Sequence, residues 1–234
     1  MKKISYEQAS AIMNLLVVRN RTAKADWMIS SYPHMRGVLV EAVEALDHYG
    51  WKWWSKQPRD FTQIQLKLVD ILHFTLSHIL SENDGNLDAA AITLVKRSDP
   101  ELSSCHFDGR EYVISKCDIP QLLELIAAFA VSRRNNLPLL EVTFHASGLD
   151  WNKVVNLYTV KHVLCIFRQN NGYKEGRYAK IWCGKEDNIH LLELASTLDS
   201  SASDFQLQLY QRLEERYVSL SSALATPLKS GQCS

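Results

Sequence analysis

The stretch VEAVEALDHYGWKWW, Val40 to Trp54, places Glu41 and Glu44 on an apolar helical segment and ends in a group of tryptophans. Its apolar residues recur at the three- and four-residue spacing of a helix. Glu41 and Glu44 stand three positions apart, so they share a helix face and their carboxylates point to one place. Gly50 follows the periodic run and predicts the end of this helix.

Helical spacing continues on both sides of this stretch. The chain has only 9 glycines and 6 prolines to interrupt it, so we expect an all-α helical bundle. Between Asn83 and Lys116 the pattern weakens, and REYVISK fits either a short strand or an extended connection. The predicted helices are Tyr6 to Asn20, Met35 to Tyr49, Phe61 to Leu80, Ile119 to Arg134, Asp150 to Arg168, Asn188 to Leu198 and Asp204 to Leu220.

Composition restricts the class of protein. Lys+Arg and Asp+Glu are both 26, so net charge does not favour nucleic acid or an anionic membrane as a partner. No segment approaches the roughly 20 apolar residues of a membrane-spanning helix. The five cysteines are scattered and form no CxxC pair, which indicates a reduced, cytoplasmic setting. We expect one domain over residues 1–222 and a loose tail over 223–234.

A third acid lies in a similar apolar context. Asp70 belongs to QIQLKLVDILHF, in the helix that follows the tryptophans. A lone acid on a helix favours a salt bridge or surface charge, but three acids in apolar helices favour a bound cation. Carboxylate oxygens select Mg²⁺, Ca²⁺ or Mn²⁺, so Glu41, Glu44 and Asp70 are the candidate metal ligands.

Three stretches together resemble a known family: VEAVEALDHYGWKWWSKQ, QIQLKLVDILHF and FRQNNGYKEGRYAKIWCGKEDN. They are similar to the dimeric all-α dUTP diphosphatases (dUTPases) of the all-α NTP pyrophosphatase superfamily. The resemblance implies a homodimeric hydrolase in which a mobile helical or loop part closes over the phosphates. It implies hydrolysis of dUTP, and of dUDP as well, with Mg²⁺ as cofactor and Mn²⁺ as a substitute. The products from dUTP would be dUMP, a precursor for thymidylate synthesis, and pyrophosphate.

The metal motif of that family reads ExxE and then ExxD, which corresponds here to Glu41, Glu44 and Asp70. The resemblance implies that Glu41 and Glu44 are also catalytic, orienting or deprotonating the attacking water. Lys67 replaces the first acid of the second pair. A protonated ammonium cannot ligate a cation, so several outcomes follow: fewer metals, a lysine on phosphate, a compensating ligand such as Asp47, or an impaired enzyme. Weakened but retained activity is the preferred outcome.

The resemblance also assigns substrate-binding positions. Trp54 would stack on the base, whereas Trp51 and Trp53 are predicted to pack in the core or at a dimer interface. His73 shares the helix face of Asp70 and would contact nucleotide or metal. The alternative is a histidine of the hydrophobic core whose hydrogen bonds are made within the protein. The other assigned positions are Asn20, Lys161, Arg168, Tyr173, Lys174, Lys180, Glu186, Asp187 and Asn188.

Two further departures leave alternatives open. Cys165 stands where relatives carry asparagine, and Val17 replaces a glutamine near the uracil-recognising position of Asn20. Because base selectivity needs polar groups against the base edge, dCTP or a broader set of deoxynucleotides stays an alternative substrate. A nucleotide-binding homologue without hydrolysis and a helical interaction protein are the other candidates. The chain has no GxxxxGK[ST] loop and no local signature of a covalent nucleophile.

Overall fold

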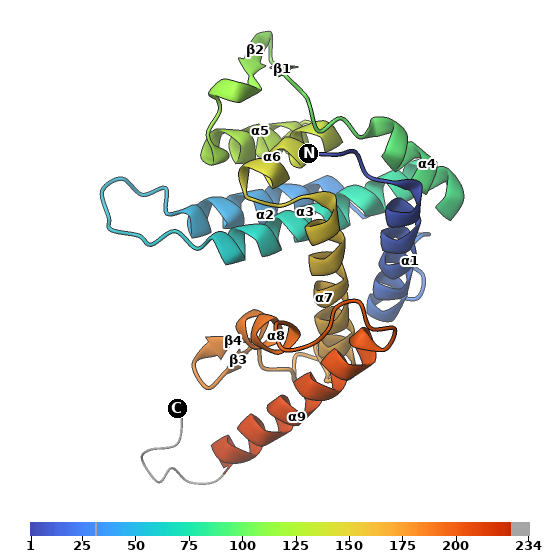
Figure 1. Ribbon diagram of the computed structural model, residues 1–234, viewed down its shortest axis with the longest axis vertical. Helices are drawn as coiled ribbons and strands as arrows, with labels where there is room; N and C mark the ends of the chain where they lie inside the picture. The colour runs from blue at the N-terminus through green and yellow to red at the C-terminus, as the bar shows by residue number, and fades with distance from the viewer. Residues whose placement is uncertain (31, 226–234) are drawn as a thin grey trace. The chain divides into compact units, whose positions relative to one another are not determined.

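The computed structural model describes residues 1–30 and 32–225. Within this part the chain is mostly helical, with two short antiparallel hairpins, and the predicted all-α fold is confirmed (Figure 1). No helix in the same part is both long and apolar enough to cross a membrane. The elements are α1 (Tyr6–Ala23), α2 (His34–Tyr49), α3 (Phe61–Glu82), α4 (Leu87–Arg97), β1 (Ser104–Phe107), β2 (Arg110–Val113), the 3-10 helix η1 (Ile114–Lys116), α5 (Ile119–Val131), α6 (Leu137–Ala146), α7 (Trp151–Asn170), β3 (Ile181–Trp182), β4 (Lys185–Glu186), α8 (Asp187–Ala195) and α9 (Phe205–Ala225).

The chain divides into two compact units. The first unit comprises Met1–Val18 and Asp26–Tyr158, and the second comprises Arg19–Ala25 and Thr159–Ser234. Helices α1 and α7 therefore have residues in both units. The single domain expected over residues 1–222 stays a prediction. The predicted loose tail begins at 223, but α9 continues to Ala225, and the remainder of the tail lies outside the described residues.

The core of the first unit forms around α3. This helix packs along α2, and its neighbours also include α4 and α6, while α5 packs on α2. Consecutive residues of α3 from Leu68 to His73 are buried, as expected for a helix covered on most of its faces. Gly37 of α2 allows close packing, because a methyl group there would lie 2.6 Å from the Phe74 ring. Glu41 and Glu44 are carried on this tightly packed helix.

Local sequence signals account for the ends of the helices that flank the tryptophans. Gly50 ends α2 with a left-handed φ of 75°, and its N–H donates to the Asp47 carbonyl, so its predicted role is confirmed. Asp60 begins α3, where its side chain accepts from the Gln63 N–H at 3.0 Å. Eleven residues thus separate the two helices, from Gly50 to Asp60, and this segment carries all three tryptophans.

The structure decides one region that the sequence leaves open and corrects the prediction in another. In the weakly patterned region after Asn83, the chain forms α4 and the β1–β2 hairpin, so Arg110–Val113 is a strand. The helix predicted from Ile119 to Arg134 ends at Val131, and a separate helix, α6, follows. Its start has a local cause, because the Asn136 side chain accepts from the Leu139 N–H at 3.1 Å.

A buried carboxylate joins three segments of the first unit. Glu141 of α6 is fully buried, and it accepts hydrogen bonds from Ser98 Oγ at 2.5 Å, the Asp99 N–H at 2.7 Å and Trp151 Nε1 at 2.8 Å. Burial raises the pKa of Glu141, an effect that the three donors partly oppose. The donors satisfy the carboxylate and tie α6 to the end of α4 and the start of α7.

Changing Glu141 to glutamine should lower the free energy of unfolding by about 1–3 kcal/mol. The amide keeps one acceptor oxygen but turns an NH₂ group toward a donor that the carboxylate now satisfies. Urea unfolding measures the loss. The exposed Glu101→Gln is the matched control and should unfold like the wild-type protein. Equal stability of the two variants would contradict the structural role of Glu141.

The second unit has its own core. Phe167 lies at its centre, with edge contacts to Tyr178, Trp182, Tyr210 and Tyr217 at centroid distances of 6.1, 6.0, 5.5 and 5.6 Å. These rings come from the loop after α7, from β3 and from α9. The loop that carries the predicted phosphate-binding residues is therefore held by buried aromatic side chains within this unit.

Candidate active site

The two acids of α2 meet a lysine of α3. Lys67 Nζ donates to Glu41 Oε2 at 3.2 Å and also to Glu44 Oε2. The side chains of Glu41 and Lys67 are mostly buried, whereas that of Glu44 is 48% exposed. The predicted same-face placement of the two glutamates is observed, and the cation between them in this structure is an ammonium group of the chain itself.

The environment of this cluster shifts the pKa values of two groups. The pKa of Glu41 is raised, first because burial disfavours its ionised form and second because the Asp70 carboxylate repels it. Burial alone would lower the pKa of Lys67, but hydrogen bonds and charges from Glu44 and Glu41 outweigh it and raise the pKa. Lys67 therefore stays protonated at neutral pH and cannot act as a metal ligand.

Asp70 and His73 lie on α3, beyond Lys67, and both are buried. Asp70 is close enough to Glu41 to affect its charge, as its contribution to the pKa shows. His73 Nδ1 lies 3.0 Å from the hydroxyl of Tyr158, within the first unit. This contact is what a core histidine makes, and a role of His73 in nucleotide or metal binding stays a prediction.

The three tryptophans lie in the loop between α2 and α3, which extends beyond the ends of these helices (Figure 1). Trp51, Trp53 and Trp54 are 49%, 89% and 58% exposed. Trp54 makes edge contacts with both of the others, at centroid distances of 5.2 and 5.5 Å. The expectation that Trp51 and Trp53 pack in the core is wrong for this chain, because the loop carries them away from the helices; a dimer interface stays a prediction.

In the second unit, the predicted residues Arg168 and Asp187 face each other. The Arg168 guanidinium donates to both oxygens of Asp187, at 2.8 and 2.7 Å, and Asp187 is only 1% exposed. The Tyr178 hydroxyl donates to the same carboxylate at 2.8 Å. Burial and the Asp187 carboxylate raise the pKa of Tyr178, and the hydroxyl stays protonated. Sequence reasoning did not select Tyr178, which carries no motif signal of its own.

Around this buried pair lies the glycine-containing loop with its basic residues. The Tyr173 ring has Arg168 Cζ at 5.9 Å and Lys180 Nζ at 5.3 Å from its centroid. Lys174 and Lys180 are exposed, and so is Glu186, the residue before α8. This arrangement presents positive charge on a loop with an aromatic face beside it. Such a surface suits the oxygens of a phosphate chain.

Asn188, in the first turn of α8, has an unusual position. It is buried, and within residues 1–30 and 32–225 its Oδ1 has no hydrogen-bond partner. A buried amide oxygen without a donor is uncommon and costs free energy. A ligand that donates to this oxygen would satisfy it. Of the other predicted positions, Lys161 is buried in α7 and Asn20 is half-buried in α1, both in the second unit.

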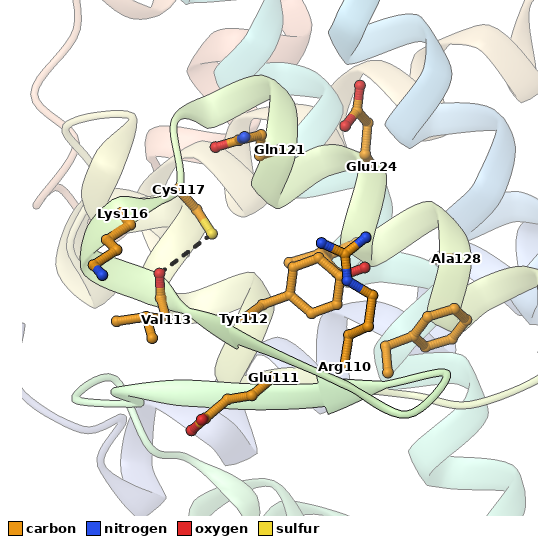
Figure 2. Close-up of a pocket in the computed structure, with 11 residues that line it drawn as sticks. Arg110, Glu111, Tyr112, Val113, Lys116, Cys117, Gln121, Glu124 and Ala128 are labelled. Atoms are coloured by element: carbon orange, nitrogen blue, oxygen red, sulfur yellow. Dashed lines mark hydrogen bonds between the residues drawn. The ribbon is translucent and has the colours of Figure 1, made fainter.

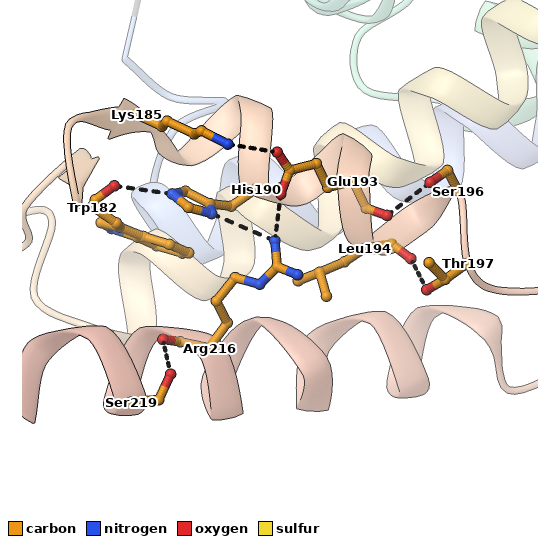
Figure 3. A network of polar contacts seen from close by, with 9 residues as sticks. All are labelled: Trp182, Lys185, His190, Glu193, Leu194, Ser196, Thr197, Arg216 and Ser219. Carbon is orange, nitrogen blue, oxygen red and sulfur yellow. Dashed lines mark hydrogen bonds and ion pairs between the residues drawn. The ribbon is translucent and has the colours of Figure 1, made fainter. Parts of the chain in front are cut away.

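Helix α9 positions α8. Arg216 of α9 donates to Glu193 of α8 at 2.8 Å, and Lys185 of β4 donates to the other oxygen of Glu193 at 3.2 Å (Figure 3). His190 Nε2 lies 3.0 Å from the Trp182 carbonyl, and the two rings stack at 5.1 Å. Since Asp187 and Asn188 begin the same helix, these contacts fix them with respect to β3 and α9.

A separate cavity of about 640 Å³ lies in the first unit, between the β1–β2 hairpin and α5 (Figure 2). Its lining mixes charged and apolar groups, and the Arg110 guanidinium lies 5.6 Å from the Tyr112 ring centroid. Cys117 Sγ donates to the Val113 carbonyl at 3.5 Å on its wall. None of the sequence-predicted site residues line this cavity.

Comparison with known proteins identifies the family of this chain. A family model described as dUTPase matches residues 7–173, more than half of the chain. The chain belongs to the dUTPase family. The match includes the acidic cluster, the tryptophan loop and the whole of α7. It confirms the family resemblance and supports nucleotide pyrophosphate hydrolysis as the general activity. A search of curated proteins finds no match.

The dUTPase match ends at Tyr173, so the assignments from Lys174 to Asn188 rest on the resemblance and the geometry above. Within the described part of the chain, no group of three or more His, Cys, Asp or Glu side chains is gathered to hold a metal ion. The chemistry of the acidic oxygens nevertheless fits magnesium, which proteins usually hold through one or two carboxylates together with substrate phosphates. Asp47, considered as a compensating ligand, instead pairs with Lys52 at 3.5 Å.

Proposed function

We propose that this dUTPase-family protein hydrolyses dUTP, and dUDP as well, with dUMP as the nucleotide product. The observation that carries the proposal is the family match over residues 7–173, which contains the paired carboxylates of α2 and Asp70 of α3. The proposed setting is a cytoplasmic homodimer that removes dUTP and supplies dUMP for thymidylate synthesis.

The proposed reaction is an in-line attack of water on the β-phosphorus. The water oxygen bonds to that phosphorus, the bond from it to the oxygen bridging toward the α-phosphate breaks, and dUMP leaves. Glu44 is the better placed of the two glutamates to receive the water proton, because its carboxylate is half exposed. Glu41, which is mostly buried and accepts from Lys67, would keep that ammonium group beside Glu44.

Magnesium is the proposed cofactor, with manganese as a substitute, and Glu41, Glu44 and Asp70 are the side chains that would hold it. When bound, the ion would neutralise charge on the phosphate oxygens and act as a Lewis acid. The chain's own contribution is to present hard oxygen ligands on two packed helices, which limits their movement.

Base and phosphate recognition are assigned to other side chains. Trp54 is the proposed stacking surface for the base, with Asn20 at the base edge. Asn188 would offer its unsatisfied amide oxygen to a donor of the ligand. The phosphate contacts are assigned to Lys161, Arg168, Tyr173, Lys174 and Lys180, with Glu186 and Asp187 as acidic neighbours that orient these cations.

The proposal is tested by measuring pyrophosphate release from dUTP with the purified protein, with and without magnesium. We expect magnesium-dependent turnover that is absent from a Glu44→Ala control. In ¹⁸O-labelled water, the label should enter pyrophosphate and not dUMP, because the attacked atom is the β-phosphorus. No turnover above the Glu44→Ala level would rule the proposal out. If the protein hydrolyses dCTP faster than dUTP, dCTP is its preferred substrate.

Changing Trp54 to alanine should raise the KM for dUTP by about 5- to 150-fold, the equivalent of roughly 1–3 kcal/mol of stacking, with a smaller effect on kcat. Steady-state kinetics with dUTP as substrate gives both constants. Trp53→Ala is the matched control, since Trp53 lies in the same loop and is 89% exposed. An unchanged KM for Trp54→Ala, or an equal rise in the control, would remove Trp54 from the base site.

One observation favours a second candidate, a nucleotide-binding homologue that has lost hydrolysis. Lys67 contacts both glutamates of the pair, so it competes with any divalent ion for the same oxygens. This candidate predicts calorimetric binding of dUTP without cleavage. A gain of turnover in Lys67→Glu would support it, whereas a loss of turnover would show that the lysine has a role in the active site.

A further inference from the structure

Lys67 occupies a defined place between two helices. It is a residue of α3, and its ammonium group donates to one oxygen of Glu41 and one of Glu44, both on α2. Its side chain is only 17% exposed, so this is a partly buried cation held by two carboxylates and not a solvated surface pair. Removing a cation from such a position is costly because it leaves like charges facing each other.

The charge of this position determines what else the cluster can hold. A carboxylate at position 67 would add one negative charge, whereas the lysine adds one positive charge. The difference is two elementary charges, which equals the charge of one divalent ion. The cluster therefore already has, without metal, the charge that a glutamate-containing version would reach only after binding one such ion.

We propose that the Lys67 ammonium is a built-in cation that takes the place of one divalent ion at Glu41 and Glu44. The chain then binds fewer divalent ions than a version with an acid at position 67. The cluster of Glu41, Glu44 and Lys67 is stable without a metal ion. The proposal deepens the proposed function, on which it rests for taking this cluster as the site of phosphate chemistry. Its test uses no nucleotide, so failure of turnover and failure of this proposal are separate results.

The experiment counts Mn²⁺ ions bound per chain by electron paramagnetic resonance, in the wild-type protein and in Lys67→Glu. We expect the variant to bind one ion more than the wild-type protein. Lys67→Met removes the charge without adding a ligand, and it should bind its first Mn²⁺ more than about tenfold tighter than the wild-type protein. Lys96→Glu, an exposed change of equal charge on α4, should bind Mn²⁺ like the wild-type protein.

Thermal melting provides a second readout that does not depend on the fold of Lys67→Glu. In EDTA, Lys67→Met should melt below the wild-type protein, and Mn²⁺ should restore most of the difference while changing the wild-type melting temperature little. Equal ion counts and affinities for all proteins would overturn the proposal. So would a gain in Lys96→Glu equal to that in Lys67→Glu, or an equal Mn²⁺-induced rise in the melting temperatures of Lys67→Met and the wild-type protein.

Discussion

Glu41→Gln should reduce kcat for dUTP hydrolysis by roughly a thousandfold. The amide keeps the size of the side chain but removes a negative charge that holds Lys67 and that would help to hold magnesium. It also places an NH₂ group where the Lys67 ammonium now donates, so Lys67 loses one of its two carboxylate acceptors. Steady-state measurement of pyrophosphate release at saturating dUTP and magnesium gives the comparison.

The control for this prediction is Glu124→Gln, an exposed change on α5 that should leave kcat within a factor of about two. Circular dichroism and thermal melting should show that Glu41→Gln keeps its helical fold, so that the loss of rate is not a loss of structure. A folded Glu41→Gln protein with near-normal kcat would show that Glu41 has no part in the reaction.

The second large effect concerns stability. Asp187→Ala should lower the free energy of unfolding by about 3–5 kcal/mol, because it leaves the mostly buried Arg168 guanidinium without its carboxylate. The Tyr178 hydroxyl loses its acceptor at the same time. Denaturant unfolding, followed by circular dichroism and by tryptophan fluorescence, measures the loss. Trp182 lies in the core of the second unit and helps to report it.

Two further variants separate the buried pair from ordinary charge effects. Glu175→Ala removes the exposed partner of Arg177, at 3.7 Å, and should cost at most about 1 kcal/mol. The double variant Arg168→Met with Asp187→Leu should be more stable than Asp187→Ala, because no unpaired charge stays buried. If Asp187→Ala unfolds like Glu175→Ala, the ion pair does not stabilise this unit.

Much of the helical architecture could be predicted from sequence, and the reasons are local. The α2 segment has apolar residues at helical spacing and ends at Gly50, where the backbone needs a positive φ. The short helix α6 was missed, although Asn136 and Pro138 are ordinary signals for a helix start, because the apolar run from α5 masked the break. The sequence does not decide the structure of residues 83–116, since a short hairpin and a short helix have weak patterns.

The sequence by itself determined that Glu41 and Glu44 share one face of a helix, because helical periodicity depends only on spacing along the chain. It could not determine that Lys67 would bind both of them, that Asp187 would face Arg168 and Tyr178, or that Trp51 and Trp53 would be exposed. Those outcomes depend on the rotation and register of one element against another and on the path of a loop. Close packing among many side chains sets these quantities, and no local pattern of residues records them.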